Sequence, residues 1–592
     1  MKTKEKKKQF LKNTLFFILL IFSYAIIGII FTYPLIKVFN THVPNNYFQE
    51  AEHTNDWGDH VQVIGGFLEH KKTIINFFTN KPIYEKEFCF SEIEYCQVGK
   101  GTDISTGWIL KKIIFSAYWG QTALNFVFDP IVTNNLWIIL SFVLSGVTAF
   151  LFARLFTKSN TIAFIASLFP VIGPGRIHHL LVGHRNGWLL YLFIIILFLV
   201  ETEVRKKLKG GLRYTIWLFI SGIMVYFSFV EPFYLMYGLI FLFSRIAWND
   251  LFEKKIFINL KSKILPTITR YLWLVFTLAS AWMATKWHRA SKLQESILAE
   301  GGRTLEEITR YSPELKLFWT RNIYDHELNI YIGIGIVIII TAVFLVWFMK
   351  SRQKQRMSYY LLFGILLLIL SLGINTPVYE FLYKNVPMFN LSRTPSRAII
   401  HFLPILTAIT AILFNYLKRL TINNKIKSNL LQFIIFLVIT TSIIISLYNF
   451  KSISLARLPD LEVDSIEPQD KILYLPITHG GHFFTTIYEY NLAYLDAVAI
   501  NGDHPYEPLA FHNFYAEYGV PLNAGWVNTQ ELNKIIEDYH ITKIIVFKDY
   551  YNNPKIEFVP EETEINDVKT MLNSSKANII EEDEDFIIYS IK

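Results

Sequence analysis

Cysteine and charged residues are scarce in this chain. Of 592 residues only two are cysteine and 18% are charged, whereas 52% are hydrophobic and 16% are aromatic. The two cysteines, Cys89 and Cys96, stand in one hydrophilic loop and lack the spacing of a zinc or redox motif. Two possibilities stay open for them: a disulfide, if the loop is extracytoplasmic, or two free thiols.

Several sequence features are missing altogether. The sequence contains no internal repeat, no low-complexity segment and no motif for binding ATP or a nucleotide sugar. The lack of repeats argues against a transporter, since many transporters are built from inverted repeats. The lack of a nucleotide motif suits chemistry outside the cytoplasm. The net charge of +8 does not indicate a nucleic-acid partner, because much of the basic charge lies in short segments between hydrophobic runs.

Long hydrophobic runs dominate the chain instead. They reach about 18–22 residues with few charges, which is the length needed to cross a bilayer core. The sequence therefore predicts an α-helical polytopic membrane protein with about eleven spans. We expect these spans at residues 14–35, 131–153, 160–176, 186–201, 214–230, 233–247, 269–286, 330–349, 359–374, 398–417 and 430–448. Because the third carries Pro170, Gly173 and Pro174, we expect it to break before the far side.

The basic residues predict an orientation. Residues 1–12 are rich in lysine, which places the N-terminus in the cytoplasm, and no small-residue cleavage site follows the first span. From that start, every later cluster of Lys and Arg falls on the cytoplasmic side. The sequence predicts a multi-pass protein of the cell membrane with a long outer loop at residues 37–130. Within that loop, residues 108–128 are expected to form an interfacial helix.

The composition changes after Tyr448. Residues 1–448 form the predicted membrane domain, whereas residues 449–592 are more polar and include an acidic run at 581–585. Buried strands are expected at 472–476, 544–547 and 586–591, and helices at 532–539 and 568–574. We therefore expect a C-terminal α/β domain, which the odd number of spans places outside the membrane.

Polar residues gather in the predicted outer connections, and the first of these contains Asp56, Asp59 and His60. Two carboxylates beside a glycine at a membrane surface suit catalysis or ion binding, although a solvated loop explains them as well. The connection after the third span contains His178, His179 and His184. Their spacing is not a known zinc pattern, which favours hydrogen-bonding roles.

Glu231 stands within an apolar run and beside Pro232. A carboxylate at membrane depth is a candidate functional residue. Its place at a turn equally allows it to face water.

The connection before the tenth span has a helix-start pattern. Thr394 suits an N-cap and Pro395 suits the first helical position, so a helix is predicted to begin here. The helix N-terminus together with Arg393 and Arg397 forms a predicted anion site suited to phosphate. The alternative is that both arginines extend to the membrane interface.

Taken in order, these motifs resemble the GT-C superfamily of membrane glycosyltransferases. That superfamily includes protein O-mannosyltransferases, lipid A aminoarabinose transferases and the YfhO-like bacterial proteins, and the chain is most similar to its uncharacterised bacterial members. The acidic motif differs, being Asp-Trp-Gly-Asp instead of the Asp-Glu pair of the mannosyltransferases. The resemblance covers most of the chain and rests on Asp56, Asp59, Asn134-Asn135, Ser141 to Gly146, Arg176 to His184, Glu327 to Gly333, Gly373 to Arg397, and the outer C-terminal domain.

The resemblance implies an inverting transfer of a hexosyl-type sugar from a polyprenyl-phosphate donor. The acceptor would be an extracytoplasmic glycan, protein or lipid. Asp59, which a helix-like stretch at 60–78 follows, would deprotonate or position the acceptor hydroxyl, with Asp56 as the second candidate.

Positive charge would stabilise the departing phosphate of the donor, and Arg393 and Arg397 would supply it. A divalent metal, Mg²⁺ or Mn²⁺, held by Asp59 would do similar work. The further substrate-binding candidates are His178, His179, His184, Glu231 and Glu327.

Two other classes of protein compete with a glycosyltransferase. A lipid or glycan transporter would need ionisable residues at the membrane midplane, and the expected spans at 330–349 and 430–448 lack charges. A non-enzymatic membrane scaffold would depend on residues 449–592 and would tolerate the loss of Asp59.

Overall fold

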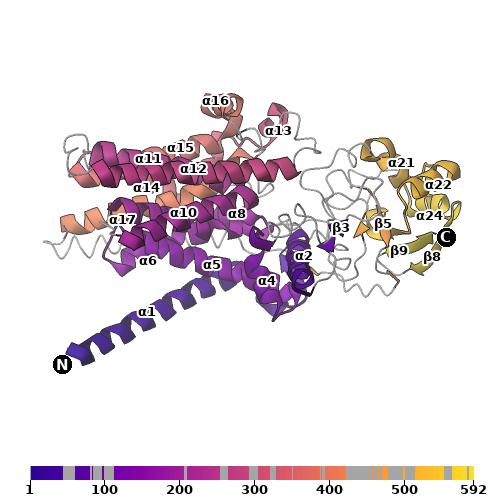
Figure 1. Ribbon diagram of the computed structural model, residues 1–592, viewed down its shortest axis with the longest axis horizontal. Coiled ribbons are helices and arrows are strands. Elements are labelled where there is room, and N and C mark those ends of the chain that lie inside the picture. The colour runs from indigo at the N-terminus through magenta and orange to yellow at the C-terminus, as the bar shows by residue number, and fades with distance from the viewer. Residues whose placement is uncertain are drawn as a thin grey trace.

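A bundle of helices forms one half of the molecule, and a small sheet with its own helices lies at the far end (Figure 1). Helix α1 (Lys2–Phe31) leans away from the bundle, with the N-terminus on the side opposite the sheet. The computed structural model describes residues 2–44, 60–79, 83–84, 97–98, 113–205, 210–253, 264–292, 304–320, 328–349, 351–386, 389, 394–421, 455–457, 465–466, 470–477, 498–499, 514–551, 560, 563–582 and 586–591.

The bundle helices begin with local signals that the sequence carries. Asp129 caps α5 by accepting a 3.0 Å hydrogen bond from the backbone nitrogen of Val132, and Pro130 is the first residue of the helix. Ser159 caps α6 in the same way. The helices are α5 (Pro130–Arg154), α6 (Asn160–Ile172), α7 (Pro174–Leu181), α8 (Arg185–Trp188), α9 (Leu190–Arg205), α10 (Gly210–Val230), α11 (Pro232–Trp248), α12 (Ile264–Lys292), α14 (Ile334–Val346), α15 (Ser351–Ser371) and α17 (Ala398–Thr421).

Four helices within the described residues are long and apolar enough to cross a membrane. They cover Leu11–Phe31, Pro130–Arg154, Gly211–Val230 and Pro395–Arg419. Helices α6 and α7 make a fifth span if the pair is taken as one, bent by 47° at Gly173, which confirms the predicted break. Other expected spans coincide with shorter or more polar helices, and the one at 430–448 lies outside the described residues. The chain is thus a multi-pass membrane protein, and the count of about eleven stays a prediction.

Helix α17 occupies the centre of the bundle. In its apolar span 94% of the residues are buried inside the protein, against 22% for the span of α1. Side chains from α5, α6, α9 and α15 pack around it in one continuous core. Residues 395–397, directly before α17, pack against α15.

The described residues of the long segment after the first span include two helices. The expected helix at 60–78 is confirmed as α2 (His60–Thr79). The expected interfacial helix at 108–128 is interrupted: residues 113–114 and α4 (Trp119–Asn125) are helical, residues 115–118 are not, and residues 108–112 lie outside the described residues. The adjoining Phe126 and Val127 are exposed.

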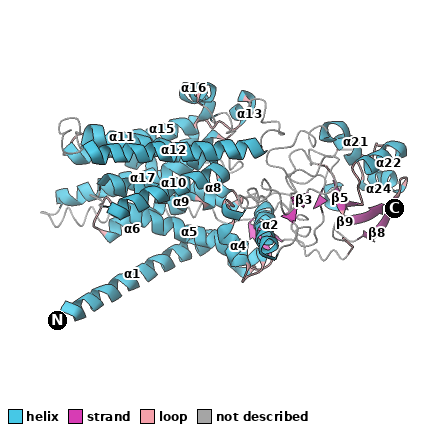
Figure 2. Cartoon of the chain, viewed as in Figure 1, coloured by secondary structure: helices cyan, strands magenta, loops and turns pink. Residues whose placement is uncertain are grey.

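A five-stranded mixed sheet lies near the C-terminus (Figure 2). Its order is β6-β5-β7-β9-β8, with β5 parallel to β6 and β7, and β9 antiparallel to β7 and β8. Helices α22 (Thr529–Asp538) and α24 (Ile565–Asn573) bury apolar residues in the same core. The strands are β5 (Lys471–Leu475), β6 (Val498–Ala499), β7 (Lys543–Phe547), β8 (Ala577–Glu582) and β9 (Phe586–Ile591).

Three strands and both helices predicted from the sequence are confirmed within one to three residues at each end. The sequence missed β8, which contains the first two residues of the acidic run. Glu582 is neutralised there by Lys548 and Lys569, at 2.9 and 2.8 Å. The proposed boundary between residues 448 and 449 stays a prediction.

Two short strands pair with each other although they stand far apart in the sequence. One follows the first span, and the other follows the last expected span. Strand β1 (His42–Pro44) pairs antiparallel with β4 (Leu455–Arg457), and Val43 lies opposite Ala456. Val43 is fully buried. The segments that follow the first and last expected spans therefore lie on the same side of the bundle.

Candidate functional site

A polar cluster lies where α7, α8, the turn between α10 and α11, and the start of α17 meet. Helix α8 is at the end of the bundle that faces the C-terminal sheet (Figure 1). Close packing holds these elements together, since a Cβ at Gly187 would lie 2.4 Å from the backbone nitrogen of Leu180. A Cβ at Gly175 would lie 3.0 Å from Ile399 Cγ2, so α7 also touches the first turn of α17.

Asn186 connects a carboxylate to a guanidinium within this cluster. In the orientation of its amide that satisfies both neighbours, the side-chain nitrogen lies 3.2 Å from Glu231 Oε1 and 2.6 Å from Oε2. The side-chain oxygen accepts a 3.2 Å hydrogen bond from Arg397 Nη1. The Tyr234 hydroxyl donates a 2.5 Å hydrogen bond to the Asn186 backbone carbonyl. Asn186 is therefore held from both its backbone and its side chain.

Glu231 is the acidic centre of the cluster. It lies between α10 and α11, outside both helices, and is only 8% exposed. Burial raises the pKa of its carboxyl above the ordinary value, and the charges of Arg397, Arg185 and His184 partly oppose that rise. The site thus contains one buried carboxylate surrounded by groups that carry, or can carry, positive charge.

The histidines of the predicted turn form hydrogen bonds, as their spacing favoured. His179 Nδ1 lies 3.0 Å from His184 Nδ1, and His178 Nδ1 lies 3.0 Å from Asn329 Nδ2. Within the part of the chain that the structure describes, no group of three or more His, Cys, Asp or Glu residues could hold a metal ion. These hydrogen bonds join His179 to His184 and His178 to Asn329.

His60 connects the segment after the first span to the same region. It is fully buried at the start of α2, and its Nε2 donates a 2.6 Å hydrogen bond to the carbonyl of Leu181 at the end of α7. Asp59 precedes His60 directly in the chain. Asp56, Asp59, Cys89, Cys96, Glu327 and Arg393 lie outside the described residues.

The start of α17 differs in detail from the predicted helix start. A single 3₁₀ turn, Pro395–Arg397, precedes the α-helix, and the side chain of Thr394 makes no capping hydrogen bond. Thr394 is therefore not the side-chain cap that the sequence predicted. Arg397 is half-buried at the end of this turn and faces Asn186.

Sequence reasoning missed three residues near the cluster. Asn186 and Arg185 directly follow His184, so their place in the same turn was a usable signal. Arg176 is fully buried, and its guanidinium donates to the carbonyls of Gly187, Val171 and Ser141. It holds the bend between α6 and α8 and is structural.

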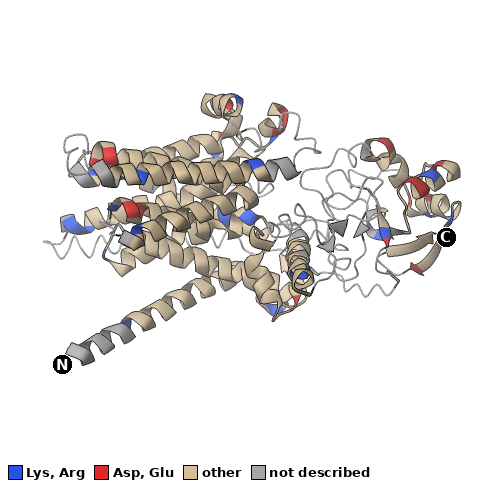
Figure 3. Ribbon diagram, viewed as in Figure 1, with Lys and Arg blue, Asp and Glu red and all other residues tan. Residues whose placement is uncertain are grey.

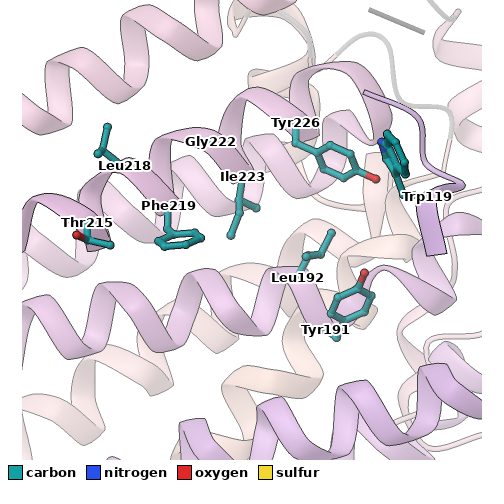
Figure 4. Close-up of a pocket in the computed structure, with 9 residues that line it drawn as sticks. All are labelled: Trp119, Tyr191, Leu192, Thr215, Leu218, Phe219, Gly222, Ile223 and Tyr226. Carbon is teal, nitrogen blue, oxygen red and sulfur yellow. The ribbon is translucent and has the colours of Figure 1, made fainter. Parts of the chain in front are cut away.

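An apolar groove runs along α10 and ends beside the cluster (Figure 4). Its volume is about 520 Å³. The rings of Trp119, Tyr191 and Tyr226 line its outer end. We call this the α10 groove, and it is lined by Trp119, Tyr191, Leu192, Thr215, Leu218, Phe219, Gly222, Ile223 and Tyr226.

The outer end of the α10 groove lies near a cation. Arg185 Nη2 donates a 3.1 Å hydrogen bond to the Tyr118 hydroxyl and interacts electrostatically with both Tyr226 and Glu231. Tyr118 neighbours Trp119 in the chain. An apolar chain in the groove would therefore end next to positive charge.

A second group of charges lies at the opposite end of the bundle, where acidic and basic residues stand together (Figure 3). Glu201 and Arg245 form a fully buried ion pair at 2.7 Å. The sequence analysis used basic residues to predict the orientation and did not identify the acidic residues that pair with them. The other pairs are Arg205–Glu201, Arg245–Glu253, Arg356–Glu253, Arg270–Asp250, Arg270–Glu203 and Arg213–Glu203.

No protein-family model matches the chain, and no curated protein matches its sequence. Solved structures of an archaeal oligosaccharyltransferase from Archaeoglobus fulgidus are similar in fold. One is AglB in complex with an inhibitory peptide and a dolichol-phosphate, with a TM-score of 0.47 and 11% identity over 98% of this chain and 74% of that chain. The apo form gives a TM-score of 0.48 and 11% identity over 97% and 74% of the two chains.

A third structure, the same enzyme in complex with Zn and sulfate, gives a TM-score of 0.43 and 11% identity over 96% and 73% of the two chains. A likeness this distant assigns no activity and no residue role.

Proposed function

We propose that the protein is a membrane glycosyltransferase that uses a sugar carried on a polyprenyl phosphate. The observation that carries this proposal is the position of Arg397, at the start of the central helix α17 and hydrogen-bonded through Asn186 to the buried Glu231. A guanidinium held beside a helix start suits a phosphate group.

The groove and the cluster together fit the two halves of such a donor. The α10 groove offers apolar and aromatic surface for a hydrocarbon chain, and Arg185 lies at its outer end. A lipid-linked phosphate carries both an apolar chain and a negative charge, so one molecule can satisfy both sites. A free nucleotide sugar would leave the groove without a matching group.

Asp59 is the proposed base, with Asp56 as the second candidate. A base within reach would take the proton of the acceptor hydroxyl as the hydroxyl oxygen attacks the anomeric carbon. The bond between the anomeric carbon and the phosphate oxygen breaks, and the polyprenyl phosphate leaves with its negative charge. Arg397 stabilises that charge, assisted by Arg393 in the proposal.

Support for Asp59 comes from its covalent neighbour. His60 is bound to the carbonyl of Leu181, and the chain reaches His184 and Asn186 only a few residues later. The acceptor would be an extracytoplasmic glycan, protein or lipid. A metal ion held by Asp59, Mg²⁺ or Mn²⁺, is part of the proposal and would act on the phosphate.

A transfer assay in membranes with radiolabelled polyprenyl-phosphate sugars tests the proposal. We expect label to move to an acceptor with the wild type and with Glu380→Gln, which changes an exposed carboxylate on α16 (Pro377–Asn385). Asp59→Asn should abolish transfer while expression holds. Removal of metal by EDTA and its return as Mg²⁺ or Mn²⁺ tests the metal. If the wild type consumes none of the donors, the glycosyltransferase proposal is wrong and a scaffold or transporter is favoured.

A further inference from the structure

We propose that Gly222 determines how long a hydrocarbon chain the α10 groove accepts, so that this residue sets the lipid-chain specificity of the donor. The inference rests on the proposed function, because it assumes a lipid-linked phosphate as the ligand. It adds a specificity-determining position, which is separate from the residues that hold the phosphate.

The groove-lining residues of α10 form one stripe along the helix. Thr215, Phe219 and Ile223 follow one another at intervals of four residues, as do Leu218, Gly222 and Tyr226. Residues at this spacing lie above one another on the same face of a helix. Gly222 is therefore the one position in the stripe without a side chain, and it lies between two large neighbours.

The gap at Gly222 is open. No described atom lies within 4 Å of a Cβ placed on Gly222, whereas a Cβ on Gly238, in the next helix, would lie 2.8 Å from Met224 Cε. Gly222 is thus not required by close packing of a described neighbour. Glycine in a helix interior is destabilising relative to alanine. A function that needs space at this point of the groove offsets that cost.

Charged residues lie on α10 beyond the last residue that lines the groove. Thr215 is the innermost lining residue of α10, and Arg213, two residues earlier, binds Glu203 of α9 at 2.8 Å. Glu203 also binds Arg270 of α12 at 3.3 Å. An apolar chain would have to desolvate this ion pair to pass further, which is unfavourable.

Geometry then limits what the groove holds. Tyr226 and Thr215 are separated by a helical rise of about 16 Å. A chain that enters beside Arg185 passes Tyr226, crosses the gap at Gly222 about 6 Å below it, and stops at Thr215. A short chain occupies only the part above Gly222, whereas a long chain needs the gap. A side chain at position 222 would therefore discriminate between the two.

The test compares two glycines of the same helix. Gly222→Leu fills the gap, and Gly211→Leu is the matched control, because no described atom lies within 4 Å of its Cβ either and it does not line the groove. Each protein, in nanodiscs, is titrated with geranyl phosphate and with undecaprenyl phosphate, and binding is read by native mass spectrometry. Gly222→Ala provides a milder change, and the unfolding temperature of each variant checks folding.

We expect the wild type and Gly211→Leu to prefer undecaprenyl phosphate over geranyl phosphate. In Gly222→Leu that preference should fall by about tenfold, since several methylene contacts are lost. The preference of Gly222→Ala should lie between those of the wild type and Gly222→Leu. Equal preference in wild type and Gly222→Leu, with both folded, overturns the inference.

The outcomes separate the inference from the proposed function. If the sugar is transferred and Gly222→Leu keeps the wild-type chain preference, only the inference about Gly222 is wrong. If Gly222→Leu loses the preference and no protein transfers sugar, the groove binds a lipid phosphate as inferred and the proposed enzyme activity is wrong.

Discussion

The side-chain nitrogen of Asn186 lies within hydrogen-bonding distance of both carboxylate oxygens of Glu231, at 2.6 and 3.2 Å. The oxygen of the same amide binds Arg397 at 3.2 Å. A neutral group thus separates a buried carboxylate from a guanidinium and satisfies both.

Loss of the Asn186 amide should destabilise the protein. In Asn186→Ala the buried Glu231 loses its donor, and we expect the free energy of unfolding to fall by about 1–3 kcal/mol. Asn385→Ala is the control, because Asn385 is an exposed residue of α16 that binds only a nearby carbonyl. Thermal unfolding in detergent measures both variants. Equal unfolding temperatures for the two would contradict the bridging role.

A swap of the two groups extends that experiment. Asn186→Asp places a second carboxylate beside Glu231, and like charges at this distance destabilise each other. Adding Glu231→Gln exchanges the amide and the carboxylate and restores the original number of charges. We expect the double variant to be more stable than Asn186→Asp alone, and a further loss in the double variant would count against the pairing.

The raised pKa of Glu231 predicts a pH dependence of stability. Between the ordinary carboxyl value of 4.5 and the raised native pKa, the unfolded chain has lost this proton while the native protein retains it. The native state then binds more protons than the unfolded state, so the free energy of unfolding falls as pH rises towards the native pKa. Below pH 4.5 both states are protonated and this contribution is constant.

Glu231→Gln removes that dependence. We expect its unfolding temperature, relative to wild type, to rise between pH 4.5 and pH 7, measured by thermal unfolding at a series of pH values. Glu380→Gln, at an exposed ion pair, should show no such trend. A relative stability of Glu231→Gln that falls with pH would mean that the native pKa is lowered instead.

The fully buried pair Glu201–Arg245 should be far more sensitive than an exposed pair. Glu201→Gln leaves the guanidinium of Arg245 without its main counter-charge, which costs about 3–5 kcal/mol when a buried pair is broken. Glu380→Gln breaks the exposed pair with Lys384 and should cost less than about 1 kcal/mol. Denaturation of both variants under one condition makes the comparison. Similar losses of stability in the two variants would show that the Glu201–Arg245 pair is solvated.

The pairing of β1 with β4 predicts a cross-link. Val43 and Ala456 lie opposite each other in the register, and opposed residues of antiparallel strands are close enough for a disulfide. In a background with Cys89→Ser and Cys96→Ser, Val43→Cys with Ala456→Cys should form an oxidised bridge. His42→Cys with Ala456→Cys is the control, since those side chains lie on opposite faces of the ribbon. Bridging in the control alone would mean a register shifted by one residue.

Several elements could be predicted from the sequence because their signals are local. Pro174 and Gly173 predicted the break between α6 and α7, and a short apolar run predicted β9. Strand β8 was missed because Glu581 and Glu582 suggest a solvated segment. Lysines from two other elements neutralise Glu582, and the local sequence around Glu582 does not predict these partners.

The candidate site divides in the same way. Arg397, Glu231 and His184 were recognised as polar residues at predicted span ends, where such residues are unusual. Their convergence on Asn186 was not predictable, because three helix ends must pack before those side chains meet. The acidic residues of the ion pairs at the opposite end of the bundle were missed for the same reason. In the sequence Glu201 resembles the polar end of a span, and only the tertiary structure shows that it pairs with Arg245.

The sequence by itself determined the class of protein, the helix positions and the distribution of basic residues, because hydrophobic length and charge act along the chain. Only the tertiary structure decided which polar groups meet, which face of α10 carries a groove, and that Val43 lies beside Ala456. Those relationships depend on distances across packed helices and strands. Such distances arise from close packing of side chains that stand far apart in sequence, and a pattern along the chain does not contain them.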